Sequence, residues 1–381
     1  MTRSRASARK ASFAKIRLRF LSQLMEVGSD SPEVLKALRF QYRHFLDSDR
    51  RTRPARRVSL RLRGSRPSLA VDAKTFSLPE GPLALAQGQA LMFESLMDAV
   101  QGHLLFHAGV VSRENRGLLV CGPPGFGKTS LVLELVRRGF AFLSDDYAPL
   151  SLTTGGIEPF PRSLGIVAAS RAPRWIDRMD SSGKILQGGK WLLDPAAIPG
   201  LRIAGPCSPE VVLLLGPASS ESRRPARYQI SVPPSLEKEL RGLLSPLPLA
   251  RRRAAHHGQS VFRFSLPGGQ EWPARLQSWV SSRRSCIYSI DRVYSRAGAF
   301  RPPLRVHDVA PRDGIVEMLS DLQNRRPTRH ARIDGDSPAV RLLLQAASVL
   351  GSRRFYRFEG GGLAARARAA LYLLGDDRSS P

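Results

Sequence analysis

One glycine-rich stretch constrains this chain of 381 residues more than any other feature. Residues 122–129 read Gly-Pro-Pro-Gly-Phe-Gly-Lys-Thr and satisfy the pattern G-x-x-x-x-G-K-[ST]. An apolar run from Leu118 to Cys121 predicts a buried strand before the stretch, and a helical pattern that ends near Gly139 follows it. This order of strand, loop and helix predicts a phosphate-binding loop of the Walker A type.

The residue types in the loop suit close contact with phosphate oxygens. Glycine lets the backbone approach an anion and adopt positive φ angles, and the following helix directs free N–H groups and a positive dipole toward it. Lys128 supplies a charge for the β- and γ-phosphates, and the hydroxyl of Thr129 is placed to bind Mg²⁺. The expected nucleotide-binding residues are Gly122, Pro123, Pro124, Gly125, Phe126, Gly127, Lys128, Thr129 and Ser130.

Two adjacent carboxylates follow the next predicted strand. The apolar run from Phe140 to Leu143 leads into Asp145 and Asp146. Ligands of open α/β sheets bind outside the carboxyl ends of the strands, so we expect both acids at the phosphate-binding edge. Adjacent strand residues point to opposite faces, which favours different roles for the two acids. One carboxylate can hold a metal ion, and the other can accept a proton from an attacking hydroxyl.

Together these residues resemble the C-terminal catalytic domain of the HPr kinase/phosphorylase family, and more closely its HPr-kinase-related members. That family joins a G-x-x-G-x-G-K-[ST] loop to a helix ending in Arg-Gly and a strand ending in Asp-Asp. The corresponding residues here are Gly122–Thr129, Arg138-Gly139 and Asp145-Asp146. The family also has a histidine one strand upstream of the loop, and His107 stands there in this chain. The resemblance covers roughly residues 95–170.

The resemblance implies an ATP-dependent kinase that uses Mg²⁺ and transfers the γ-phosphoryl group to a hydroxyl. By resemblance the acceptor is a serine of a small protein or peptide. Asp146 resembles the catalytic base of the family, with His107, Lys128 and Arg162 as active-site partners. Thr129 and Asp145 are the expected ligands of the metal ion.

The sequence departs from the family close to Arg162. This residue begins Arg-Ser-Leu-Gly-Ile, which resembles the family's Arg-Gly-Leu-Gly-Ile segment. Two residues earlier the family has a metal-binding glutamate, and this chain has Phe160, with Glu158 nearby but displaced. From the residues alone, His107 is more typical of a core or strand-edge histidine, because it lies in an apolar run, Leu104 to Ser112, that predicts a single strand.

Two alternative functions remain open from the sequence. Phe160 favours a nucleotide-dependent switch or assembly protein that binds ATP without transferring phosphate. The formal net charge of +27 invites a nucleic-acid binder, whose affinity would fall steeply with salt. We expect no nucleic-acid partner, because the arginines are spread along the chain and zinc-finger spacing is absent from it. Only eight of the 59 basic residues are lysines, which makes Lys128 notable.

The predicted fold class is α/β, with a nucleotide-binding core like that of HPr kinase and PEP carboxykinase. We expect a disordered basic extension over residues 1–15 and an accessory strand–helix–strand region over residues 16–80. The core should span residues 81–245, and residues 246–381 should form a C-terminal α/β extension. In the accessory region, Ser31 and Pro32 predict a helix start, with Ser31 as the N-cap.

Composition bears on location and partners. No apolar run approaches the ~20 residues of a membrane-spanning helix, so we expect no membrane partner. The three cysteines lack metal-binding spacing and fit a reducing compartment, which favours the cytoplasm. The expected partner is a small protein or peptide that bears a serine, and a homo-oligomer is left open.

Overall fold

The computed structural model divides into two compact units, residues 1–96 and residues 97–381. The described residues are 13–63, 66–78, 80, 82–123, 126–167, 175–187, 190–216, 226–232, 234–247, 251–253, 260–266, 273–282, 289–292, 303–320, 322–323 and 338–375. Most of the predicted basic extension, residues 1–12, lies outside them. The α/β class predicted from the sequence is confirmed, since both units combine helices with sheets.

The first unit is a five-stranded sheet with two helices, in the strand order β1-β2-β3-β4-β5. Its strands are β1 (Ala14–Phe20), β2 (Gln23–Ser29), β3 (Arg56–Arg61), β4 (Ser68–Val71) and β5 (Lys74–Ser77), and its helices are α1 (Pro32–Gln41) and α2 (Pro82–Met97). Strands β2 and β3 are parallel, with α1 in the connection between them, and the other neighbours are antiparallel.

Helix α1 begins where its sequence predicts. The hydroxyl of Ser31 accepts a hydrogen bond from the backbone N–H of Val34 at 3.3 Å, and Pro32 occupies the first turn. The helix ends at Gln41, and a 3₁₀ turn over Arg43–Phe45 follows. One face of α1 is buried, which fastens the helix to the unit through its apolar side chains.

The second unit is organised around a six-stranded sheet in the order β19-β20-β14-β8-β7-β9. Its strands are β7 (Gly109–Arg113), β8 (Arg116–Cys121), β9 (Ala141–Ser144), β14 (Ser208–Gly216), β19 (Arg305–Val309) and β20 (Arg354–Glu359). Strands β20, β14 and β8 are parallel, and β9 shares their direction because β7 is antiparallel to both β8 and β9. The carboxyl ends of these four strands therefore lie at one edge of the sheet.

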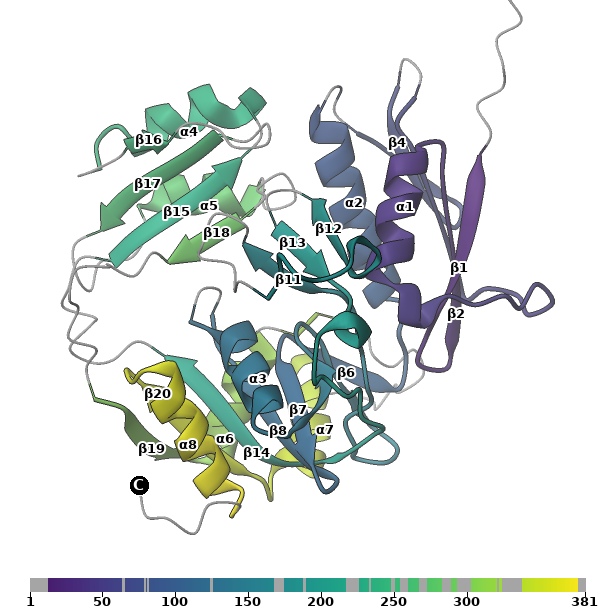
Figure 1. Ribbon diagram of the computed structural model, residues 1–381. Helices are drawn as coiled ribbons and strands as arrows, with labels where there is room; N and C mark the ends of the chain where they lie inside the picture. Colours follow the sequence, from purple (N-terminus) through teal and green to yellow (C-terminus); the bar gives the residue numbers. More distant parts are fainter. Residues whose placement is uncertain are drawn as a thin grey trace, which may run out of the picture. The chain divides into compact units, whose positions relative to one another are not determined.

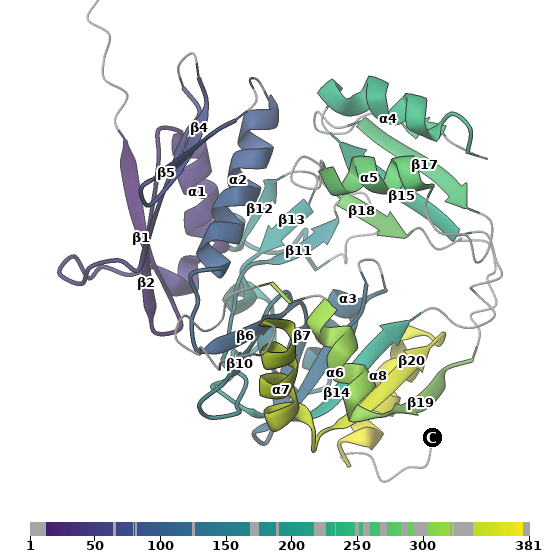
Figure 2. The same cartoon turned by 180° about the vertical axis from the view of Figure 1, so that it is seen from behind.

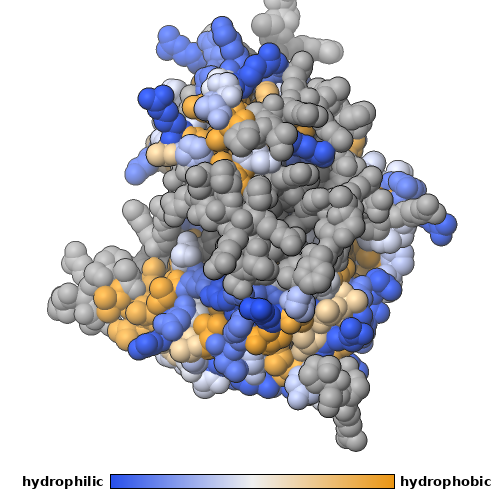
Figure 3. Space-filling model, turned by 90° about the vertical axis from the view of Figure 1, so that its left-hand side faces the viewer, coloured by the Kyte–Doolittle hydropathy of each residue, from blue (hydrophilic) through white to orange (hydrophobic). Residues whose placement is uncertain are grey.

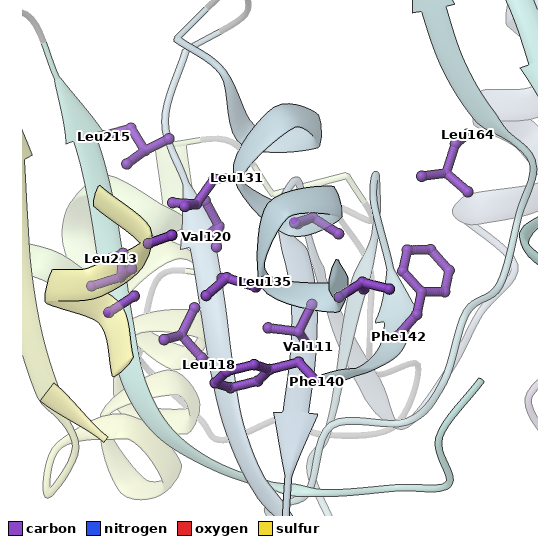
Figure 4. Close-up of a cluster of buried hydrophobic side chains, with 14 of the residues drawn as sticks. Val111, Leu118, Val120, Leu131, Leu135, Phe140, Phe142, Leu164, Leu213 and Leu215 are labelled. Carbon is purple, nitrogen blue, oxygen red and sulfur yellow. The ribbon is translucent and has the colours of Figure 1, made fainter. Parts of the chain in front are cut away.

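Helices cover both faces of this sheet (Figures 1 and 2). Helices α3 (Lys128–Arg137) and α8 (Leu363–Leu373) lie on one face, and α6 (Pro311–Ser320) and α7 (Pro338–Leu350) lie on the other. The apolar residues of β8 alternate between the two cores. Figure 4 shows Leu118 and Val120 facing the helix that carries Leu131 and Leu135, while Leu119 belongs to the opposite cluster.

The described residues of the second unit also form three smaller sheets. One pairs β6 (His103–Phe106) with β10 (Ala148–Ser151), and another contains β11 (Leu164–Val167), β13 (Lys190–Leu193) and β12 (Lys184–Gln187). The third contains β15 (Ala226–Val232), β16 (Arg251–Arg253), β17 (Ser260–Leu266) and β18 (Ser289–Arg292). Along the chain, the strands of this third sheet and two helices follow in the order β15, α4 (Glu237–Leu244), β16, β17, α5 (Ala274–Ser282) and β18. Short 3₁₀ turns lie at Ser181–Gly183, Pro195–Ala197 and Pro234–Leu236.

The single strand predicted over Leu104–Ser112 is wrong. The chain forms two strands, β6 and β7, which belong to different sheets. His107 and Ala108 make the corner between them, where the N–H of Ala108 donates to the carbonyl of Phe106 at 3.0 Å. An uninterrupted apolar run cannot distinguish one strand from two, because a long buried strand and two short buried strands both consist of apolar residues.

The central sheet draws strands from both sides of one predicted boundary. Strands β7, β8, β9 and β14 come from residues 81–245, and β19 and β20 come from residues 246–381. The predicted domain limits stay predictions.

Within the described residues, no helix is both long and apolar enough to cross a bilayer. On the face shown in Figure 3, hydrophilic and hydrophobic residues are mixed. The exposed apolar side chains of the second unit include Val316 and Leu344.

Candidate active site

The glycine-rich loop leaves the carboxyl end of β8 and enters α3. Gly122 has φ of +140°, and a Cβ there would lie 2.6 Å from the carbonyl oxygen of Leu215 on β14. Gly127 has φ of +90° and is the N-cap of α3. Both positions therefore require glycine, one for close packing and both for conformation. Pro124 and Gly125 lie outside the described residues.

Lys128 places a buried positive charge inside this loop. Its ammonium nitrogen donates to the carbonyl oxygen of Gly122 at 2.6 Å and to that of Pro123 at 3.5 Å. Lys128 as a whole is only 8% exposed. The N-cap Gly127 offers no side chain to accept from the first N–H groups of α3. The loop thus combines a helix N-terminus with a lysine ammonium, an arrangement suited to an anion.

Thr129 and Asp145 form a second pair beside the loop. The hydroxyl of Thr129 donates to Oδ2 of Asp145 at 3.2 Å. The other oxygen, Oδ1 of Asp145, is buried and accepts no hydrogen bond from the described residues. Burial, and after it the charge of Asp146, raise the pKa of the Asp145 carboxyl to about 7. A carboxylate oxygen left in this state fits a ligand position for a hard cation such as Mg²⁺.

Asp146 has a different set of neighbours from Asp145. Nη1 of Arg162 donates to Oδ2 of Asp146 at 3.0 Å, and Nδ1 of His107 lies 3.7 Å from Oδ1 and 3.1 Å from the backbone oxygen. Burial works to raise the pKa of Asp146, but the combined effect of basic side chains outweighs it and lowers the pKa. In decreasing order of effect they are Arg162, His107, Lys190 and Lys128.

The pKa values of the two acids are shifted in opposite directions, and the different roles expected for them stay a prediction. Near neutral pH the Asp146 carboxyl is ionised and salt-bridged, and the Asp145 carboxyl is poised between its two forms. Their side chains reach different partners, Thr129 for one and Arg162 for the other. Such a separation of pKa values is common where neighbouring groups take different roles in catalysis.

Phe160 is part of an aromatic core behind these acids. It is fully buried and meets the ring of Tyr147 edge to face, with centroids 5.7 Å apart. The N–H of Glu158 donates to the carbonyl of Pro149 at 2.9 Å, and its charge, after burial, helps to raise the pKa of the Cys207 thiol. That thiol lies near Gly117 at the start of β8, opposite the loop. Within the described residues, no group of three His, Cys, Asp or Glu side chains could hold a metal ion.

The structure brings six of the predicted site residues near one another. Thr129 contacts Asp145, His107 and Arg162 contact Asp146, and the charge of Lys128 acts on both acids. Ser130 is exposed on the first turn of α3, and Phe126 packs against the core next to this helix. Ser163, which replaces a glycine of the resembling segment, has a buried hydroxyl without a hydrogen-bond partner in the described part of the chain.

Two residues near the site were missed from the sequence. Lys190 on β13 helps to lower the pKa of Asp146, and its stem passes Gly165, where a Cβ would lie 3.7 Å from Cδ. Arg366 on α8 donates to the carbonyl of Phe126 in the loop. The scarcity of lysine could have drawn attention to Lys190, but no local pattern singles out Arg366 among so many arginines.

Comparisons with known proteins show only distant similarity to solved structures. No family model matches this sequence, and no curated protein matches it. Among solved structures, the Hpr(Ser) kinase/phosphatase from Coxiella burnetii is similar at 15% sequence identity, with a TM-score of 0.21. The similar part covers 47% of this chain and 93% of the other chain.

Proposed function

We propose that this chain is an ATP-dependent kinase, which transfers the γ-phosphoryl group of Mg²⁺-bound ATP to a serine hydroxyl of a small protein or peptide. One observation carries the proposal. An ionised carboxylate, Asp146, and a carboxylate with an unfilled buried oxygen, Asp145, lie side by side at the glycine-rich loop. An anion site, a cation site and a proton acceptor are the three elements that phosphoryl transfer needs.

The loop from Gly122 to Thr129 would bind the phosphates of the nucleotide. In the free protein the Lys128 ammonium hydrogen-bonds the loop's own carbonyls, and phosphate oxygens would replace these weaker acceptors. The first N–H groups of α3, which no N-cap side chain satisfies, would complete the cradle. Binding therefore exchanges internal contacts for stronger charge-assisted ones.

Thr129 and Asp145 would hold the Mg²⁺ ion. A magnesium ion takes few protein ligands and completes its shell with water and phosphate oxygens, so a hydroxyl and one carboxylate suffice. When bound, the ion neutralises charge that develops on the phosphates. The buried Oδ1 of Asp145, which accepts no hydrogen bond from the described residues, would then bind the cation.

Asp146 would orient the acceptor hydroxyl and accept its proton. The oxygen of the serine forms the new bond to the γ-phosphorus, the bond to the β-phosphate oxygen breaks, and the hydroxyl proton passes to Asp146. The low pKa of this carboxylate suits a loose transition state, in which the proton leaves late and orientation of the hydroxyl matters most. Arg162 and His107 hold the carboxylate in place, and Lys128 offsets the charge of the transferred group.

Phosphate transfer from radiolabelled ATP to a pool of serine peptides tests the proposal. Wild-type protein should label a peptide, and Asp146→Asn should lower the rate by about 10²–10⁴-fold while ATP still binds. Asp177→Asn removes an exposed carboxylate of the same unit and should leave the rate unchanged. An unchanged rate in Asp146→Asn would show that this residue is not the proton acceptor.

Phe160 supports a second candidate, an ATP-dependent switch or assembly protein without phosphoryl transfer. A buried phenylalanine occupies the position at which the resembling family carries a metal-binding glutamate. ATP binding by the loop does not need this second carboxylate, whereas transfer depends more strongly on the metal shell. Tight ATP binding without a labelled product from any serine peptide would favour this candidate over the kinase.

A further inference from the structure

Arg366 joins two turns that lie far apart in the sequence. It stands in the first turns of α8, directly after the glycine-rich turn that follows β20. Its Nε donates to the carbonyl oxygen of Gly360 at 2.8 Å, and its Nη1 donates to that of Phe126 at 2.9 Å. One guanidinium thus ties the turn after β20 to the loop after β8, across 240 positions of sequence.

The sheet explains how one side chain can reach both turns. Strands β20, β14 and β8 are parallel neighbours in that order, so the turns at their carboxyl ends lie at the same edge. Helix α8 packs beside α3, and Ala367, the residue after Arg366, is fully buried in the core cluster that the two helices share. The core therefore fixes the backbone from which the guanidinium extends.

The hydrogen bond to Phe126 sets the orientation of a peptide in the loop. The Phe126–Gly127 peptide bond is trans and planar, so its C=O and N–H groups point in opposite directions. With the carbonyl held by Arg366, the N–H of Gly127 is directed away from α8. Gly127 is left-handed and Lys128 is helical, a combination that turns successive N–H groups to one side and forms an anion-binding nest.

We propose that Arg366 is a positioning residue for nucleotide phosphates: it holds the Phe126–Gly127 peptide so that the Gly127 N–H is oriented to donate before the nucleotide arrives. This inference rests on the proposed nucleotide binding by the loop. Arg366 acts through the loop backbone, and the planar fork of its guanidinium is needed to reach two carbonyls at once. A lysine keeps the charge but loses this geometry.

Calorimetric titration with ADP and Mg²⁺ tests the role of Arg366. Arg366→Gln and Arg366→Lys should both weaken ADP binding about tenfold, because each loses the double hydrogen bond. Arg368→Gln is the matched control, since it removes an exposed arginine from the same helix and should leave the Kd unchanged. Wild-type affinity in Arg366→Lys, or equal weakening in Arg368→Gln, would show that general charge acts here and would overturn the inference.

Other outcomes separate this inference from the proposed function. If wild-type protein binds ADP and Arg366→Gln binds it equally well, the inference fails and nucleotide binding stands. If wild-type protein binds neither ADP nor ATP, the proposed function fails and takes the inference with it. If the variants do not fold, hydrogen exchange of wild-type protein decides. ADP should then slow exchange over residues 360–366 as well as in the loop, and unchanged exchange over 360–366 contradicts the coupling.

Discussion

Asp145→Asn is expected to stabilise the metal-free protein, increasingly so as the pH rises. Burial, followed by the charge of Asp146, raises the pKa of Asp145 from 3.8 to about 7. The folded state therefore retains a proton that the unfolded state loses between about pH 4 and pH 7, and stability falls as the pH rises through this window. Three pKa units correspond to about 4 kcal/mol, which water around the half-buried side chain reduces to about 2 kcal/mol.

Urea unfolding in the presence of a chelator measures this difference. All four tryptophans lie in residues 97–381, so their fluorescence reports on the unit that contains Asp145. The gain in unfolding free energy should grow from about pH 4 to pH 7 and then level off. Asp177→Asn should show no such gain. If Asp145→Asn is less stable than wild type at pH 8, the ionised Asp145 carboxylate stabilises the metal-free protein. This result would refute the prediction that the carboxylate destabilises the fold until a cation binds.

Three further substitutions test other parts of the structure. Gly122→Ala places a Cβ 2.6 Å from a carbonyl oxygen at a φ of +140°, so it should cost about 2 kcal/mol in urea unfolding and abolish ATP binding; normal binding would contradict the loop geometry. Phe160→Glu buries an unpaired charge and should cost about 3–5 kcal/mol, whereas Phe160→Leu should cost about 1 kcal/mol; a stable Phe160→Glu would show that this position can reach solvent or metal. Ser31→Ala removes the N-cap of α1 and should cost the first unit about 1 kcal/mol in thermal unfolding; an unchanged Tm would mean that the cap contributes nothing.

Features with a local physical cause could be predicted from the sequence. The start of α1 follows from Ser31 and Pro32, and the strand before Gly122 and the helix after it follow from the apolar pattern. The two carboxylates were expected at a strand end, and they follow β9 directly. Each of these depends on residues a few positions apart, where side-chain type and backbone preference act together.

Features that depend on distant segments could not be predicted. Nothing near β20 indicates that it pairs with β14, because parallel pairing is set by the whole sheet and not by the strand itself. The corner at His107 is likewise decided by which sheets the flanking strands join. Arg366 reaches the loop only because α8 packs beside α3, a contact that no local spacing encodes.

A crystal structure of the protein with Mg²⁺ and ADP would show directly whether the loop binds the phosphates and Asp145 binds the metal ion. We expect the β-phosphate to accept hydrogen bonds from the N–H groups of Gly127 and Lys128. The Lys128 ammonium should leave the carbonyl of Gly122 for the phosphate, and the metal ion should lie about 2.1 Å from oxygens of Thr129 and Asp145. Nucleotide bound away from this loop, or a metal ion remote from Asp145, would rule out the proposed nucleotide and metal site.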